Sequence, residues 1–132
     1  MVPFAGYDMP LTYPNLSITA STKHTREHCS LFDVSHMLQS SMKGAKAEEF
    51  LSHLVVADLD LLAISQSMFS VLTNANGGII DDLIIKRVGK NEFYIVSNAG
   101  CRDKDIEHIK SQLKKFKGAK DVEFKEIQGM AL

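Results

Sequence analysis

Gly77-Gly78-Ile79-Ile80-Asp81-Asp82-Leu83-Ile84-Ile85 is the stretch of sequence that decides the fold of this chain. Two adjacent glycines supply the unusual backbone angles of a tight turn. The run that follows them is short, rich in β-branched residues and without proline, as a buried strand should be. The stretch therefore predicts a turn followed by a strand.

Two carboxylates lie in the middle of this strand. Successive side chains of a strand point to opposite faces, so Asp81 is expected on one face with Ile79 and Leu83, and Asp82 on the other with Ile80. A carboxylate among isoleucines must find hydrogen-bond donors, bind a cationic or protonated group, or take up a proton. A lone strand aspartate is usually structural, but two in a row favour one structural and one functional residue.

This strand is expected to pair with a neighbour on each side. Alternating residues 67–73 predict the strand before it, and residues 92–97 predict the return strand after it. Connections this short can only join antiparallel neighbours. The strands at about 67–73, 79–88 and 92–97 should therefore form one antiparallel meander.

The turn after the central strand sets the group that faces Asp82. A three-residue loop of residues 89–91 sets Asp82 opposite Asn98, whereas a two-residue turn at residues 89–90 sets it opposite Ser97. Either register gives Asp82 a polar partner. A carboxylate and an amide that converge in this way can recognise a heteroaromatic ring that carries both donors and acceptors.

The whole chain is predicted to be one α+β domain with two parts. Residues 1–34 hold an irregular segment with all three prolines up to residue 16, and a helix over about 15–29. Residues 35–132 follow the order strand, helix, three strands, helix, strand, with helices at about 45–54 and 101–117. This is a split βαβ pattern with one strand added, an antiparallel sheet with helices packed on one face.

Length and composition exclude several classes of protein. A chain of 132 residues suits one domain with a core, and a net charge of -1 gives no reason to expect nucleic acid or an anionic membrane as partner. No apolar run is long enough to span a bilayer. Two cysteines are too few for a disulfide framework, which favours a reducing compartment.

No metal site is expected. His24 and His28 would present two imidazoles on one helix face, with Cys29 and His36 nearby in the sequence. The glutamate of the metalloprotease pattern and a second cysteine pair are missing, so exposed helix histidines explain the pattern better. Cys101, at the start of the long helix, is interpreted as a small core or helix-start residue.

Five motifs along the chain point to one known family. They are Met1-Val-Pro-Phe-Ala-Gly6, Phe32-Asp-Val-Ser-His-Met37, Leu72-Thr-Asn74, Gly77-Gly-Ile-Ile-Asp-Asp-Leu-Ile84 and Val96-Ser-Asn-Ala99. In this order and spacing they resemble the aminomethyltransferase of the glycine cleavage system, the T-protein. The resemblance covers nearly the whole chain but only the opening third of a family member. The chain is therefore expected to be the N-terminal portion of this folate-binding fold, inactive on its own.

The resemblance implies a transferase of one-carbon groups in glycine catabolism. The family enzyme passes the aminomethyl carbon from the lipoyl arm of H-protein to tetrahydrofolate, which releases ammonia and forms methylenetetrahydrofolate. The implied partners are lipoylated H-protein and tetrahydrofolate as co-substrate, with no metal, nucleic acid or membrane. The implied location is the mitochondrial matrix in a eukaryote and the cytoplasm otherwise.

The resemblance also assigns site residues. Asp82 matches the catalytic aspartate near the reacting folate nitrogens, where its charge would orient and activate an amine. Met37, Phe69, Val96 and Asn98 match the folate pocket. The alternatives are a folate-binding module without catalysis and an interaction domain, neither of which needs this acid. A part of a ring of packed domains is also expected to expose apolar surface, and therefore to self-associate or to have a loosely ordered segment over residues 1–16.

Overall fold

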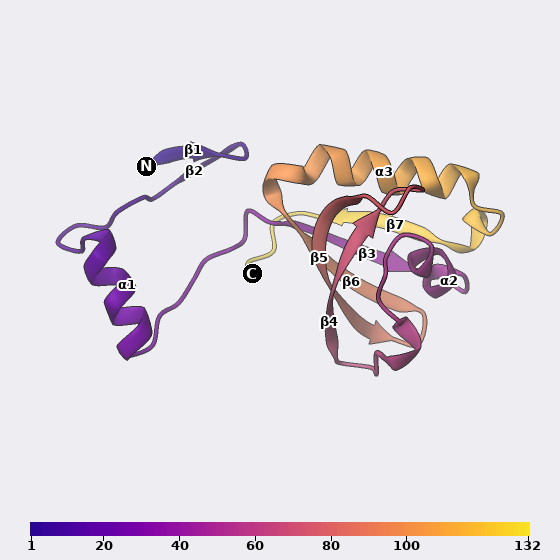
Figure 1. Ribbon diagram of the computed structural model, residues 1–132, viewed down its shortest axis with the longest axis horizontal. Helices are drawn as coiled ribbons and strands as arrows, with labels where there is room; N and C mark the ends of the chain where they lie inside the picture. Colours follow the sequence, from indigo (N-terminus) through magenta and orange to yellow (C-terminus); the bar gives the residue numbers. More distant parts are fainter. The chain divides into compact units, whose positions relative to one another are not determined.

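The computed structural model describes residues 1–132 and divides them into two units. The N-terminal unit comprises Met1–His36 together with Met130–Leu132, and the sheet unit comprises Met37–Gly129. Figure 1 labels the elements of each unit along the chain. All the site residues named from the sequence belong to the sheet unit.

An asparagine turn precedes the central strand. The Asn74 carboxamide oxygen accepts two backbone N–H hydrogen bonds, one of them from Gly78 at 2.9 Å. Gly77 has a φ of 79°, a left-handed conformation that glycine adopts without strain. The turn joins β4, Ser67–Thr73, to β5, Ile79–Gly89, and these strands pair antiparallel. The predicted turn and both strands are confirmed.

The second hairpin contains a β-bulge. β6, Glu92–Ser97, returns from β5 so that Gly89 pairs with Glu92, and Val88 is left out of the ladder. The predicted three-residue loop of residues 89–91 is therefore one residue too long, because β5 continues through Gly89.

Beyond the bulge the register brings Asn98 to Asp82. Leu83 lies opposite Ser97, so the next residue along each strand places Asn98 beside Asp82. Of the two registers considered from the sequence, the one that faces Asp82 with Asn98 is confirmed and the one with Ser97 is wrong.

The remaining strands complete a five-stranded sheet. β3, Leu38–Lys43, lies between β6 and β7, Glu123–Ile127, which gives the order β4-β5-β6-β3-β7. All neighbouring strands are antiparallel, so β6 and β7 run in the same direction on either side of β3. Helix α3, Arg102–Lys115, joins β6 to β7. The predicted split βαβ pattern of an α+β fold is therefore confirmed.

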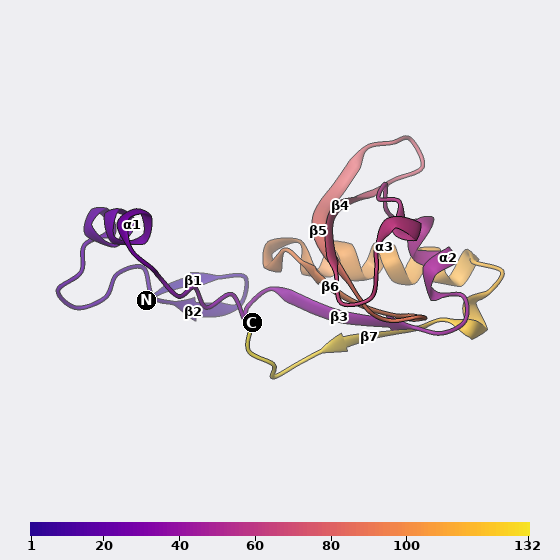
Figure 2. The ribbon, with the colours of Figure 1, turned by 90° about the horizontal axis from the view of Figure 1, so that it is seen from below.

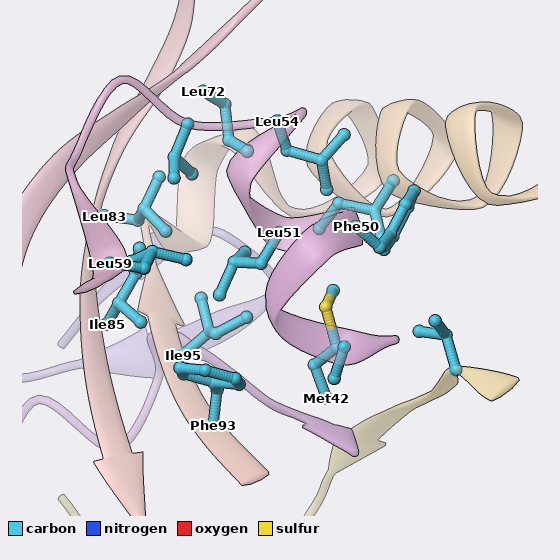
Figure 3. Packing of buried hydrophobic residues seen from close by; sticks show 14 of the residues in the cluster. Met42, Phe50, Leu51, Leu54, Leu59, Leu72, Leu83, Ile85, Phe93 and Ile95 are labelled. Carbon is cyan, nitrogen blue, oxygen red and sulfur yellow. The ribbon is translucent and has the colours of Figure 1, made fainter. Parts of the chain in front are cut away.

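Helices α2, Ala47–Ser52, and α3 pack on one face of the sheet. Both lie on the same side of β3 and β7 in Figure 2. Apolar side chains that alternate along the strands fill the space between sheet and helices, and each contributes about 1.5–3 kcal/mol by leaving water. Figure 3 labels the core residues Met42, Phe50, Leu51, Leu54, Leu59, Leu72, Leu83, Ile85, Phe93 and Ile95.

The helices end somewhat inside their predicted bounds. α3 is preceded by the 3₁₀ turn η2, Ala99–Cys101, and stops because Phe116 adopts an extended conformation with a ψ of 127°. Two further 3₁₀ turns, η1 at Leu59–Leu61 and η3 at Ala119–Asp121, connect the strands and helices. Asp103 in the first turn of α3 and lysines in its last turn suit the helix dipole. None of the helices combines the length and the apolar character needed to cross a bilayer.

The N-terminal unit contains a short hairpin and a helix. The hairpin strands are β1, Val2–Phe4, and β2, Tyr7–Met9, so residues 1–16 are not irregular throughout as predicted. The turn between them places Gly6 at a φ of 84°.

Helix α1, Ile18–Glu27, lies within the predicted range of 15–29 and is shorter at both ends. The Ser17 hydroxyl accepts the Ala20 backbone N–H at 3.1 Å and caps the helix. Asn15, the first residue of the predicted range, has a φ of 62° and lies before the helix.

A buried arginine anchors the far end of β5 to the helix layer. The Arg87 guanidinium donates two hydrogen bonds to the Glu48 carboxylate and one to Leu59 O at 2.8 Å. It also lies 4.8 Å from the centre of the Phe93 ring. These contacts offset the free-energy cost of removing the guanidinium charge from water on the core side of the sheet.

We expect Arg87→Met to destabilise the chain by about 2 kcal/mol, because it leaves Glu48 and Leu59 O without their donors. Denaturation by urea, followed by circular dichroism, measures this change. Lys86→Met, at the exposed neighbouring position of β5, is the matched control and should change the free energy of unfolding by less than about 0.5 kcal/mol. Equal effects of the two substitutions would contradict the anchoring role.

Candidate functional site

The face of the sheet opposite α2 and α3 carries the residues named from the sequence. Phe69 lies opposite Ile84 and Ile84 lies opposite Val96, so these side chains share a face. Asp82 precedes Ile84 by two positions and Asn98 follows Val96 by two, which places both on that face. We call this surface of Phe69, Asp82, Ile84, Val96 and Asn98 the outer face.

Met37 lies at the end of the same row. Gln39 pairs with Val96, and Met37 comes two positions before Gln39, directly ahead of β3. The Tyr94 hydroxyl donates a hydrogen bond to Gln39 Oε1 at 2.6 Å. Neither Gln39 nor Tyr94 was predicted to belong to the site, because polar residues that alternate in a strand are ordinary.

A β-bulge at Ile80 precedes the two acids of β5. Ile79 and Asp81 both pair with residues of β4, whereas Ile80 between them has no partner in the ladder. Ile80 therefore packs against the core and Ile79 is 70% exposed, so the predicted grouping of Ile79 with Asp81 and of Ile80 with Asp82 is wrong. Asp81 is buried with 9% exposure and Asp82 is exposed, so the two acids do lie in different environments.

Asn98 bridges these two acids. Its backbone N–H donates to Asp81 Oδ2 at 3.2 Å, and its Nδ2 donates to Asp81 Oδ1 at 3.1 Å and to Asp82 Oδ1 at 2.8 Å. A carboxylate only accepts hydrogen bonds, so the NH₂ group of Asn98 must face both acids. The Asn98 Oδ1 acceptor is therefore directed away from them.

Burial and hydrogen bonding act in opposite directions on these acids. Burial raises the pKa of Asp81, but hydrogen bonds from Asn98, Asp105 and Cys101 outweigh it and hold this pKa below the ordinary value of 3.8. Burial raises the pKa of Asp105, on α3, to about 7. Burial also raises the pKa of Cys101, which suits its interpretation as a structural residue at the helix start.

The outer face combines a carboxylate, an amide and an apolar floor. The side chains of Phe69, Ile84 and Val96 offer a surface on which a flat ring can lie. The Asp82 carboxylate and Asn98 Oδ1 can accept N–H groups at the edge of such a ring. A carboxylate in this position can also orient a ligand amine and make it a better nucleophile.

Comparison with known proteins gives the family. The GCVT N-terminal domain family matches residues 1–131. The chain belongs to this family. It is 45% identical over all its 132 residues to a probable mitochondrial aminomethyltransferase of Schizosaccharomyces pombe, of which it covers 33%. It is 51% identical over 117 residues to the mitochondrial aminomethyltransferase of Flaveria trinervia, where 89% of this chain covers 28% of that protein.

A solved structure supports the same assignment. The glycine cleavage system aminomethyltransferase T from Bartonella henselae matches with a TM-score of 0.86 and 39% identity, over 96% of this chain and 34% of that chain. The resemblance to the aminomethyltransferase family and the expected fold class are confirmed. The chain spans about a third of the length of these relatives, between 28% and 34%.

Asp105 is a residue of this family member that the sequence analysis missed. It is an acid in the first turn of α3, yet it is fully buried. A signal was present, since Asp105 lies four residues before the buried Ile109 and therefore on the apolar stripe of α3.

The histidines and cysteines considered from the sequence do not gather into a group of potential metal ligands. The rings of His24 and His28 lie 4.9 Å apart, and His24 Nε2 is 3.2 Å from Cys29 O. No cluster of three or more histidines, cysteines or acids in residues 1–132 could hold a metal ion. The outer face is the arrangement in which residues distant in the sequence come together with useful chemistry.

We expect Asp81→Asn to lower the free energy of unfolding by about 1–3 kcal/mol, because it removes the charge and replaces one of the two oxygens that accept Asn98 N–H groups by an NH₂ group. Asp82→Asn, the same change at the exposed neighbour, is the control and should have an effect below about 0.5 kcal/mol. Urea denaturation of both variants measures the difference.

The pH dependence of this effect follows from the direction of the pKa shift. The pKa of Asp81 is lowered in the folded state, so its stabilisation is present above its ordinary pKa of 3.8 and is lost as the pH falls through the folded pKa. The difference between the unchanged chain and Asp81→Asn should therefore shrink below about pH 4. A difference that stays constant from pH 7 to pH 3 would contradict the role of the Asp81 charge.

Proposed function

We propose that the outer face binds tetrahydrofolate in an aminomethyltransferase, and that Asp82 is the catalytic residue. The reaction is the transfer of the aminomethyl carbon from lipoylated H-protein to tetrahydrofolate, with release of ammonia and formation of methylenetetrahydrofolate. Met37, Phe69, Val96 and Asn98 contact the pterin ring of the co-substrate in this proposal. The residues 1–132 supply this part of the site, and H-protein is the macromolecular partner.

The single observation that carries the proposal is the environment of Asp82. This carboxylate is exposed on the outer face and accepts a hydrogen bond of 2.8 Å from Asn98 Nδ2. Asp81, its neighbour, already satisfies the structural need for an acceptor beneath the strand end. An exposed acid that the fold does not need as a buried acceptor, and that lies beside an apolar surface, is suited to bind a ligand amine.

The location follows from the relatives and stays a proposal for this chain. The proteins of Schizosaccharomyces pombe, Flaveria trinervia and Mus musculus that it resembles are named mitochondrial. We propose the mitochondrial matrix if the source is a eukaryote and the cytoplasm otherwise.

A chimera tests the catalytic role directly. Residues 1–132 replace the matching segment of the Bartonella henselae aminomethyltransferase T, and turnover is assayed with lipoylated H-protein and tetrahydrofolate. We expect Asp82→Asn to lower turnover about 100-fold, as is typical when a positioned electrostatic or acid–base group loses its charge. The affinity for tetrahydrofolate should change much less, because the amide keeps the shape of the side chain.

Asp81→Asn in the same chimera is the matched control, one residue away and equal in chemistry. Per folded molecule it should keep turnover within a few-fold, while its melting temperature falls. Full activity of Asp82→Asn would show that Asp82 is not the catalytic residue. An unchanged chimera that binds tetrahydrofolate but shows no turnover would indicate the alternative, a folate-binding module without catalysis. If the folded chimera does not bind tetrahydrofolate, the proposed site is contradicted, and an interaction domain is the remaining alternative.

We also propose that the 132-residue chain self-associates through the outer face. Phe69 and Ile84 lie side by side on it with exposures of 66% and 48%, and adjacent exposed apolar groups favour association. Sedimentation velocity should show species larger than the monomer at micromolar concentration, and Phe69→Asn should reduce them. Ile64→Asn, at an apolar position 57% exposed outside this face, is the control. A monomer at all concentrations would refute self-association.

A further inference from the structure

A buried acid lies beneath the Asn98 bridge and has no part in the proposed chemistry. Asp105, on α3, is 0% exposed, and neither of its carboxylate oxygens meets a hydrogen-bond donor in good geometry. An ionised carboxylate in this position would be costly, whereas a neutral carboxylic acid needs only an acceptor for its O–H group. The neighbouring Asp81 carboxylate is such an acceptor.

The hydrogen bonds of Asp81 decide which acid carries the proton. Asp81 accepts from the backbone N–H and from Nδ2 of Asn98, at 3.2 Å and 3.1 Å. Two adjacent carboxyl groups cannot both be ionised without a large cost. Since Asp81 accepts two N–H hydrogen bonds and Asp105 meets no donor in good geometry, the proton belongs on Asp105.

We propose that Asp105 is a positioning residue, a neutral carboxylic acid whose O–H donates to Asp81, so that Asp81 holds the Asn98 carboxamide with Nδ2 toward Asp82 and Oδ1 toward a ligand. The chain of contacts runs from α3 through the end of β5 to the outer face. It selects a ligand that presents an N–H donor, and not a carbonyl, to Asn98. The selection of folate by Asn98 rests on the proposed function, whereas the protonation of Asp105 does not.

The electrostatic surroundings agree with this placement. The pKa of Asp105 is raised to about 7: burial is the largest cause and the neighbouring Asp81 acts in the same direction, whereas the Ser97 hydroxyl and the charge of Lys104 act in the opposite direction. Lys104, on the same helix, directs its Nζ to Ile80 O at 2.6 Å. Cys101, from the turn before α3, hydrogen-bonds to Asp81. These are the titratable and charged groups that act on the pair.

Carboxyl carbon NMR of the 132-residue chain tests the proton directly and needs no ligand. Asp105 should titrate near pH 7. The Asn98 Nδ2 protons should shift with the same midpoint, because Asp81, which accepts their hydrogen bond, then loses the O–H donor of Asp105. The signal of Asp103, exposed on the same helix, serves as the internal comparison. Titration of Asp105 near the ordinary aspartate value of about 4 would overturn the inference.

The pH dependence of stability gives a second measurement. A carboxyl group whose pKa is raised in the folded state contributes stability that is complete below its unfolded pKa, 3.8, and is lost as the pH rises through the folded pKa, about 7. Asp105→Asn should remove this slope between about pH 4 and pH 7. A slope unchanged by Asp105→Asn would overturn the inference.

Two variants in the chimera separate positioning from simple packing. Asp105→Asn keeps a donor toward Asp81 and should hold turnover within about threefold, whereas Asp105→Leu removes the donor and should lower turnover per folded molecule about tenfold by releasing Asn98. Asp103→Leu is the control at the exposed position. Equal turnover of the Asn and Leu variants would contradict the positioning role. Loss of folate binding by the unchanged chimera, with Asp105 still titrating near pH 7, would refute the proposed function instead.

Discussion

The pleat of strand β5 is the constraint on which the rest of the structure depends. One face of this strand is covered by the helix layer and the other is not, so consecutive side chains must suit a buried and an uncovered environment in turn. Leu83 and Ile85 satisfy the covered side with apolar groups. Asp81 falls on the same side, and Asn98 stabilises it there by donating hydrogen bonds to both of its oxygens.

β5 therefore carries a charged anchor near each end of its buried face. Arg87 is held by Glu48 of the helix layer, and Asp81 is held by Asn98 at the start of the connection to α3. The apolar residues between these anchors form the core with α2 and α3. Because the buried face meets the structural needs of the strand, Asp82 and Ile84 on the opposite face are available for binding.

Asn98 joins the two faces of the sheet. It follows the last residue of β6 and precedes the turn η2, where the chain leaves the sheet for α3. Its side chain is half-buried and contacts an acid from each face, so it links the core beneath Asp81 to the outer face. The central position of β6, between β5 and β3, then brings Val96 between Ile84 and Gln39.

The sequence by itself determined the strands at 67–73 and 92–97, the split βαβ order and the family, because hydrophobic periodicity and turn residues are local and the motifs are colinear. It also indicated that Asp81 and Asp82 face opposite ways, since alternation is a property of any strand. It did not predict the bulges at Ile80 and Val88, which adjust one strand to its neighbours in the sheet. Only the tertiary structure decided that Asp105 is buried beside Asp81, because α3 is distant in sequence from β5 and a first-turn acid is usually exposed.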